Sequence, residues 1–272
     1  MTTRIETTFN TLREQNKKAL IPYVMAGDPN PSVTVSLLHE LVDHGADIIE
    51  VGLPFSDPMA DGETIALAGE RAIAAGTSTR QAIDMVREFR KNNQHTPVLV
   101  MGYLNPVEII GYDKFIAMCE DAGIDGVLMV DLPPQEAGSF TQKLANSHMN
   151  EIFLLAPTTL PARRDEVLKH GSGFIYYVSV KGVTGSKALD AADVGQHVQA
   201  IKAQTALPVC VGFGIRDGAS AKAVGQDADG VIVGSELVKN FANVGNDEQQ
   251  IAHAKKLILD KMDELRQAID SL

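Results

Sequence analysis

Two carboxylate residues that lie close together in the sequence are the strongest candidates for proton-transfer chemistry. Glu50 lies inside the apolar run Ile48–Leu53, and Asp61 follows in the next loop. A carboxylate buried without a partner is costly to ionise, so we infer that Glu50 serves a function. The flanking Ile and Val residues favour a strand buried on both faces. The alternative is a glutamate that faces solvent.

The two carboxylates are predicted to hold different protonation states. Shielding from water would raise the pKa of Glu50 toward neutrality, so that this group can act as both acid and base. Asp61, which is better solvated, would stay ionised and accept a hydrogen bond. Three other polar residues lie in or just after apolar runs and are further candidates, namely Tyr103, Asp131 and Tyr176.

Glycine-rich turns follow three later apolar runs and predict a phosphate site. They are Lys181–Gly185, Gly212–Ile215 and Gly234–Ser235. Glycine lets backbone N–H groups approach an anion closely, and a helix beginning at Ser235 would direct its positive end toward it. One glycine pair alone is weak support, because turns use glycine for its conformational freedom.

Other common kinds of catalytic site lack support in the sequence. The seven histidines show no metal-ligand spacing, so no metal site is expected. There is no G-x-S-x-G motif, no Walker loop and no dinucleotide-binding fingerprint. A Schiff-base aldolase needs a lysine within an apolar strand. Lysines are nearly absent from the predicted strand ends, and the one lysine close to a glycine loop is Lys181, so this mechanism is disfavoured.

The elements that must position these groups alternate regularly along the chain. Apolar runs rich in β-branched residues predict eight strands, at 19–26, 48–53, 98–103, 127–130, 152–155, 174–179, 209–211 and 231–233. Segments of helical periodicity lie between them, at 33–44, 79–92, 114–122, 135–147, 163–170, 194–205 and 219–226. Since no linker divides the chain, we expect residues 1–272 to form one (β/α)₈ TIM barrel.

Two further features belong to the ends of this barrel. Extra helices are expected at 5–15 and along the apolar stripe that runs from Ile251 to Ile269. A weak internal repeat places Asp47, Asp125 and Asp229 after a small turn and before an apolar strand. These three turns would lie at one end of the barrel, although αβ loops in general have a similar composition.

The overall composition restricts the function classes. Of the 272 residues, 44% are hydrophobic, which is ample for a large core, and the formal charge of −11 argues against nucleic-acid binding. The two cysteines show no disulfide or zinc spacing and favour a reducing cytoplasm. The sequence shows neither a signal peptide nor a membrane-spanning run of about 18 apolar residues.

The residues that carry chemistry resemble a known family. The stretch from Glu50 through Gly62, EVGLPFSDPMADG, is similar to the signature of the tryptophan synthase α subunit. The likeness extends over nearly the whole chain, including the stretches 21–29, 103–106, 179–185, 212–215 and 234–235.

The resemblance implies a carbon–carbon lyase built on a (β/α)₈ barrel. Such an enzyme cleaves indole-3-glycerol phosphate to indole and glyceraldehyde 3-phosphate by a retro-aldol reaction. The indole passes to a β subunit within an α₂β₂ assembly, where it is used to make tryptophan. The α subunit needs no cofactor, whereas the β subunit carries pyridoxal phosphate.

The resemblance also implies roles for particular residues. Glu50 would shuttle protons, Asp61 would stabilise positive charge on the indole N–H, and Tyr176 would lie beside Glu50. The other expected substrate-binding residues are Tyr23, Ile65, Met101, Tyr103, Leu128, Thr184, Gly185, Phe213, Gly214, Gly234 and Ser235. The residues expected to contact the β subunit are Asp57, Pro58 and Asn105.

The chain departs from the family pattern at four positions. Glu63 follows the Asp-Gly pair where proline is usual, and Gly69 lies in a run that is usually more polar. Tyr23 stands where phenylalanine is frequent, and Lys181 where a small polar residue is common. None of these departures removes a proposed catalytic group.

Two rival functions remain open at the level of the sequence. One is another phosphate-binding barrel enzyme that acts on a related indole or sugar phosphate. The other is a barrel that binds a phosphate ligand mainly to regulate a partner. The presence of Glu50, Asp61 and Tyr176 argues against the regulatory alternative.

Overall fold

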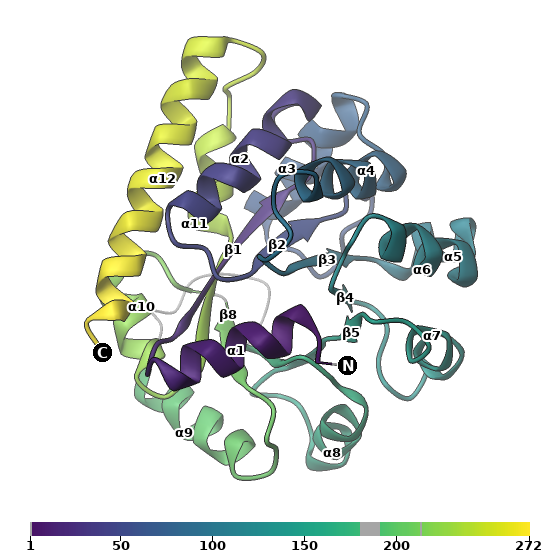
Figure 1. The fold of residues 1–272 in the computed structure, drawn as a ribbon, viewed down its shortest axis with the longest axis vertical. Coiled ribbons are helices and arrows are strands. Elements are labelled where there is room, and N and C mark those ends of the chain that lie inside the picture. The colour runs from purple at the N-terminus through teal and green to yellow at the C-terminus, as the bar shows by residue number, and fades with distance from the viewer. Residues whose placement is uncertain (1, 180–190, 213) are drawn as a thin grey trace.

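Parallel strands alternate with helices throughout the computed structural model, which describes residues 2–179, 191–212 and 214–272. The helices surround the strands on all sides (Figure 1). The strands are β1 (Ala19–Met25), β2 (Ile49–Gly52), β3 (Val98–Gly102), β4 (Gly126–Met129), β5 (Asn150–Glu151), β6 (Phe153–Leu155), β7 (Ile175–Val178), β8 (Val209–Gly212) and β9 (Gly230–Val233). Their order in the sheet is β5-β4-β3-β2-β1-β9-β8-β7-β6, and every pairing is parallel. The predicted TIM-barrel class is confirmed.

The barrel closes at a strand that is interrupted. The sequence predicts one fifth strand at 152–155, but the structure divides it at Ile152 into β5, which pairs with β4, and β6, which pairs with β7. The Ile152 N–H still donates to the Val127 carbonyl at 2.9 Å. The single predicted strand is therefore corrected to two short ones that share the position of the fifth barrel strand.

The described helices include every predicted helical segment and add others. They are α1 (Arg4–Glu14), α2 (Pro31–Asp43), α3 (Glu63–Ala74), α4 (Thr79–Arg90), α5 (Leu104–Ile110), α6 (Tyr112–Asp121), α7 (Gly138–Leu144), α8 (Pro161–His170), α9 (Ala191–Lys202), α10 (Gly218–Gly225), α11 (Ser235–Val238) and α12 (Glu248–Asp270), with a 3₁₀ turn at Lys239–Phe241. The long α12 runs along one side of the molecule (Figure 1). The periodicity did not predict α3, which follows the loop after β2, or α5, which begins just after β3.

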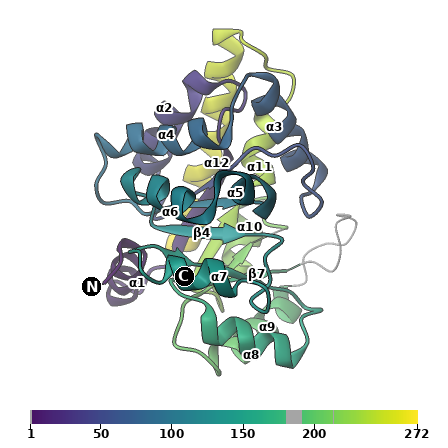
Figure 2. The same ribbon diagram turned by 90° about the vertical axis from the view of Figure 1, so that its right-hand side faces the viewer.

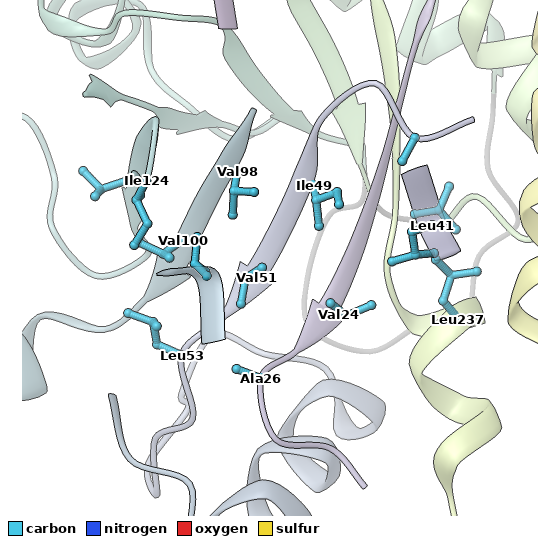
Figure 3. Packing of buried hydrophobic residues seen from close by; sticks show 14 of the residues in the cluster. Val24, Ala26, Leu41, Ile49, Val51, Leu53, Val98, Val100, Ile124 and Leu237 are labelled. Carbon is cyan, nitrogen blue, oxygen red and sulfur yellow. The ribbon is translucent and has the colours of Figure 1, made fainter. Parts of the chain in front are cut away.

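Two apolar layers result from the alternation of side chains along each strand. The outer layer fills the space between the strands and the helices, as the labelled residues Ile49, Val51, Leu41 and Leu237 illustrate (Figure 3). The inner layer fills the barrel with residues such as Ile21, Ile48, Leu99, Leu128 and Ile232.

Helix α1 covers the amino-terminal end of the barrel. Its residues Ile5, Phe9 and Leu12 are buried and belong to the same apolar cluster as the barrel interior. In the side view, α1 lies beside one end of the strands, away from α3 (Figure 2). The amino-terminal end of the barrel is therefore covered by apolar side chains of α1.

The three aspartates of the internal repeat each join two neighbouring strands. The side chains of Asp47, Asp125 and Asp229 accept a hydrogen bond, each at 2.8 Å, from the backbone N–H of Leu20, Val98 and Val209 respectively. The N–H of each aspartate donates in return to the carbonyl of the same residue, at 3.0, 2.8 and 2.8 Å. Each aspartate also forms an ion pair, with Arg266, Arg90 and Lys202 in turn. The repeat therefore has a structural role at the amino-terminal end of the barrel.

Candidate active site

Glu50 points into the barrel from the middle of β2. Its neighbours Ile49 and Val51 face the helices (Figure 3), so the alternation of the strand turns Glu50 toward the interior. The residue is 1% exposed, and neither carboxylate oxygen has a hydrogen-bond partner among the described residues. The predicted buried strand position is confirmed, and the solvent-facing alternative is wrong.

Burial in this setting keeps Glu50 protonated at neutral pH. Desolvation, followed by the negative charge of Asp61, raises the pKa of Glu50 to about 8. A carboxylic acid with such a pKa can donate a proton near neutral pH and take one back in a later step.

Asp61 lies in the loop between β2 and α3 and is only partly buried. Desolvation raises its pKa to about 6, although a hydrogen bond from Tyr103 opposes this shift. The Tyr103 hydroxyl also accepts a hydrogen bond from the Ala60 N–H at 3.0 Å, which ties the loop to the end of β3. Asp61 is thus ionised at neutral pH while Glu50 is protonated, as the sequence led us to expect.

Tyr23 and Tyr176 project into the barrel and each lies against a glycine of a neighbouring strand. A Cβ atom added to Gly52 would lie 2.1 Å from the Tyr23 hydroxyl, and one added to Gly212 would lie 2.4 Å from the Tyr176 hydroxyl. A side chain at either position would therefore displace the tyrosine that packs on it. Burial is the main cause that raises the pKa of both tyrosines well above the ordinary value, so both are neutral phenols.

A cavity of about 170 Å³ opens at the carboxyl ends of the strands. Eight residues predicted for the site line it: Tyr23, Asp61, Ile65, Met101, Tyr176, Gly214, Gly234 and Ser235. Helix α11 begins at Ser235, as expected. The structure therefore brings together residues that are more than 200 positions apart in the sequence.

Three predicted residues lie behind the cavity wall. Glu50 and Leu128, each 1% exposed, lie within the barrel, and Tyr103 holds the Asp61 loop. Their contact with substrate stays a prediction. Thr184, Gly185 and Phe213, also predicted to bind substrate, lie outside the described residues.

Seven lining residues were not among those predicted from the sequence. They are Ala60, Gly62, Val130, Leu154, Val178, Ile215 and Ile232. Val130, Leu154, Val178 and Ile232 lie near the carboxyl ends of strands and point inward. Inward positions recur every second residue, so counting from the predicted residues Leu128 and Tyr176 would have found Val130 and Val178.

The three residues predicted to contact a partner lie at the same end of the barrel as the cavity. Asp57 and Asn105 are exposed and Pro58 is half-buried. Met59, in the loop after β2, and Ile109, in α5, are exposed large apolar residues, at 76% and 80%. Apolar side chains so fully exposed at the cavity end are compatible with a protein contact there.

No cluster of three metal-ligating side chains occurs in residues 2–179, 191–212 and 214–272. In the same ranges, no helix is both long enough and apolar enough to cross a membrane. The cavity is lined mainly by apolar residues, the ionised Asp61 is part of its lining, and the protonated Glu50 is buried within the barrel. This arrangement suits proton transfer to and from a mainly apolar ligand.

Comparisons with known proteins agree with this geometry. A family model described as tryptophan synthase alpha chain matches residues 9–269. The tryptophan synthase alpha chain of Psychrobacter arcticus is 71% identical, over 99% of this chain and 98% of the relative. The solved tryptophan synthase subunit alpha of Legionella pneumophila is 39% identical, covers 100% of both chains and has a TM-score of 0.90. A chain of Mycobacterium tuberculosis tryptophan synthase is 34% identical, with 99% of both chains covered and a TM-score of 0.87.

Proposed function

The chain belongs to the tryptophan synthase alpha chain family of lyases, and we propose that it cleaves indole-3-glycerol phosphate to indole and glyceraldehyde 3-phosphate. The observation that carries this proposal is the combination of a protonated Glu50 buried within the barrel and an ionised Asp61 in the lining of an apolar cavity, close enough for the charge of Asp61 to raise the pKa of Glu50. The same pair does not fit a barrel that only binds a ligand, because an unpartnered buried carboxyl group costs stability.

In the proposed reaction Glu50 acts first as an acid and then as a base. Its proton passes to the ring carbon that bears the glycerol chain, and Asp61 stabilises the resulting positive charge through the ring N–H. The Glu50 carboxylate then removes the proton of the hydroxyl on the adjacent carbon. As the new aldehyde forms, the carbon–carbon bond breaks and its electron pair restores the aromatic ring. Glu50 ends protonated, so the cycle needs no external acid, oxidant or cofactor.

The substrate orientation follows from the lining of the cavity. We place the indole ring against Tyr23, Ile65 and Met101, deep in the barrel, and the phosphate at the strand ends near Gly214, Gly234 and Ser235. Thr184, Gly185 and Phe213, the remaining predicted contacts, are assigned from the family resemblance alone.

The test is the release of indole from indole-3-glycerol phosphate by the purified chain. Glu50→Gln keeps the shape of the side chain but removes its acid–base function, and it is expected to lower kcat by at least about a hundredfold. Asp61→Asn is expected to lower kcat to a similar extent. Thermal unfolding and binding of the substrate provide the controls for folding. Near-normal turnover by Glu50→Gln would contradict the proton-shuttle role.

We further propose that a tryptophan synthase β subunit binds the cavity end of the barrel in an α₂β₂ assembly and supplies the pyridoxal phosphate. Support comes from the family and from the exposed Asp57, Asn105, Met59 and Ile109 around the cavity. Adding a β subunit to the indole-release assay should raise the rate. An unchanged rate and no co-elution would contradict this partner. The cytoplasmic location inferred from the cysteines remains a prediction.

A further inference from the structure

Tyr23 carries a buried donor that the proton-transfer steps do not use. The residue is 4% exposed and lines the cavity, yet its hydroxyl finds no hydrogen-bond partner in the part of the chain that the structure describes. Leaving a buried hydroxyl unpaired costs about 1–3 kcal/mol of folding free energy. The unpaired state of this hydroxyl in a residue that lines the cavity is explained if its hydrogen-bond partner is a bound ligand.

The position of this hydroxyl is set by the strands on both sides of β1. Tyr23 is in register with Glu50 on β2, and its hydroxyl lies above Gly52, the next inward position along β2 toward the cavity. On the other side, a Cβ added to Gly234 would lie 3.3 Å from the Tyr23 Cβ. Close packing on both sides holds the ring in place, with its hydroxyl against Gly52 and near enough to Asp61 and Glu50 for their charges to raise its pKa.

The chemistry of the surroundings decides what this hydroxyl can bind. The ionised Asp61 is a hydrogen-bond acceptor, and in the proposed reaction it accepts from the ring N–H. The protonated Glu50 directs its own proton at the ring carbon. The polar atoms of the substrate that lie between the ring and the phosphate are the two glycerol hydroxyl oxygens, and these need a donor.

We propose that the Tyr23 hydroxyl is a substrate-positioning group that donates a hydrogen bond to a glycerol hydroxyl oxygen of the substrate. This inference rests on the proposed function and adds a determinant of specificity to it. The contact distinguishes indole-3-glycerol phosphate from analogues with the same ring and phosphate but an unsubstituted alkyl chain.

The test compares Tyr23→Phe with the unmodified protein on two ligands. The first is indole-3-glycerol phosphate, assayed by indole release, and the second is indole-3-propyl phosphate, which lacks both hydroxyls, assayed as an inhibitor. One neutral hydrogen bond corresponds to about a three- to tenfold change. Tyr23→Phe should therefore lower kcat/KM for the first ligand by that factor and leave the inhibition constant of the second unchanged. The stability of the free protein should be equal or higher, because an unpaired hydroxyl is removed.

Tyr177→Phe provides a matched control. Tyr177 is also buried with an unpartnered hydroxyl within the described ranges, but it faces the outer layer and stacks on His197. This substitution should leave both ligands unaffected.

Four outcomes would overturn the inference. Equal effects of Tyr23→Phe on both ligands would show that the hydroxyl does not recognise the glycerol oxygens. The absence of any effect on either ligand would show the same. A shift of the alkaline limb of the pH profile in Tyr23→Phe, with no preference between ligands, would show that the hydroxyl acts on Glu50 instead. No indole release by the unmodified protein, with or without a β subunit, would overturn the proposed function itself.

Discussion

At the scale of single residues, the site depends on two carboxyl groups whose surroundings separate their pKa values. Glu50 has no hydrogen-bond partner among the described residues, and burial raises its pKa to about 8. Asp61 is less buried and receives a hydrogen bond from Tyr103, so its pKa rises only to about 6. Two carboxyl groups therefore serve as an acid and as an anion at the same pH.

The pH profile of kcat/KM should be bell-shaped. Activity should fall below about pH 6, because protonated Asp61 no longer stabilises the positive ring, and above about pH 8, because ionised Glu50 has no proton to donate. The two limbs belong to the coupled pair rather than to either residue alone. The measurement is initial-rate indole release from pH 5 to 9.

Tyr103→Phe is the control for the assignment of the acid limb. The Tyr103 hydroxyl lowers the pKa of Asp61, so its removal should move the acid limb to higher pH and leave the alkaline limb in place. A profile that is identical to that of the unmodified protein would show that Asp61 does not set the acid limb.

At the scale of elements, each strand end and each loop has a small number of contacts that fix it. Asp131, a candidate for the site in the sequence, accepts a hydrogen bond from the Leu104 N–H at 2.8 Å and so fixes the start of α5. Glu63, where the family usually has proline, is exposed in the first turn of α3, where a negative charge suits the helix dipole. Gly69, the other departure from the family pattern in α3, is less favourable because glycine in a helix interior lowers stability.

Gly69→Ala should stabilise the protein. Gly69 is buried within α3, and an added Cβ would meet Met25 Cε at 3.6 Å and the Phe55 carbonyl at 3.7 Å, which are ordinary contact distances. Removing a glycine from a helix interior is worth about 0.5–1 kcal/mol. The measurement is the free energy of unfolding in denaturant.

Gly195→Ala in α9 is the matched control for this substitution. An added Cβ there would lie 2.3 Å from the Asp227 carboxylate, which accepts a hydrogen bond from Gln199. The helix-propensity gain should then be offset by the displacement of Asp227. If both variants gave the same gain, the available space would not be what distinguishes the two sites.

Asp125→Asn should be the most costly change among the three aspartates that join strands. The Asp125 side chain is 2% exposed and pairs with Arg90, which is 7% exposed. Desolvation lowers the pKa of Arg90 to about 10, and the charge of Asp125 opposes this. Loss of that charge leaves a buried cation and should cost about 3–5 kcal/mol of folding free energy.

Asp229→Asn removes the corresponding ion pair at a more exposed site. The Asp229 and Lys202 side chains are 29% and 32% exposed, so solvent screens the pair and the cost should be about 1 kcal/mol or less. Denaturant unfolding of both variants gives the comparison. Equal losses would mean that the burial of the ion pair does not decide the cost.

At the scale of the whole molecule, stability should decrease as the pH rises from 5 to 8. Glu50 and Glu151 both have raised pKa values in the folded state, Glu151 to about 7, with burial as the main cause in each. The folded state therefore binds more protons than the unfolded state in this range. The stability present below the unfolded pKa of about 4.5 is lost as pH rises through the folded values.

Glu151→Gln separates the structural carboxyl group from the catalytic one. Glu151 lies on β5, is 7% exposed, and one of its carboxylate oxygens has no partner within the described ranges. Its substitution should flatten the loss of unfolding free energy between pH 5 and 7 by about 1–3 kcal/mol. Activity should be preserved. An unchanged pH dependence of denaturant unfolding would show that Glu151 is solvated in the folded state.

Several features of this protein were determined by the sequence alone. Apolar runs separated by helical segments predicted the barrel, because both periodicities arise from local backbone geometry. The apolar residues around Glu50 predicted its burial, and the order of strands placed Asp61, Tyr103 and Asp131 at one end of the barrel. The family motifs predicted the reaction class.

Other features were decided only by the tertiary structure. The division of the fifth strand at Ile152 depends on how the barrel closes, and the position of Tyr103 against Asp61 depends on how β3 lies beside the loop after β2. The Tyr23 hydroxyl lies over Gly52 because of the register between β1 and β2. The alternation of side chains along a strand shows which of them face inward. It does not show which strands are neighbours or how far one strand is shifted along the other. Strand order and register set the distances between the reacting groups.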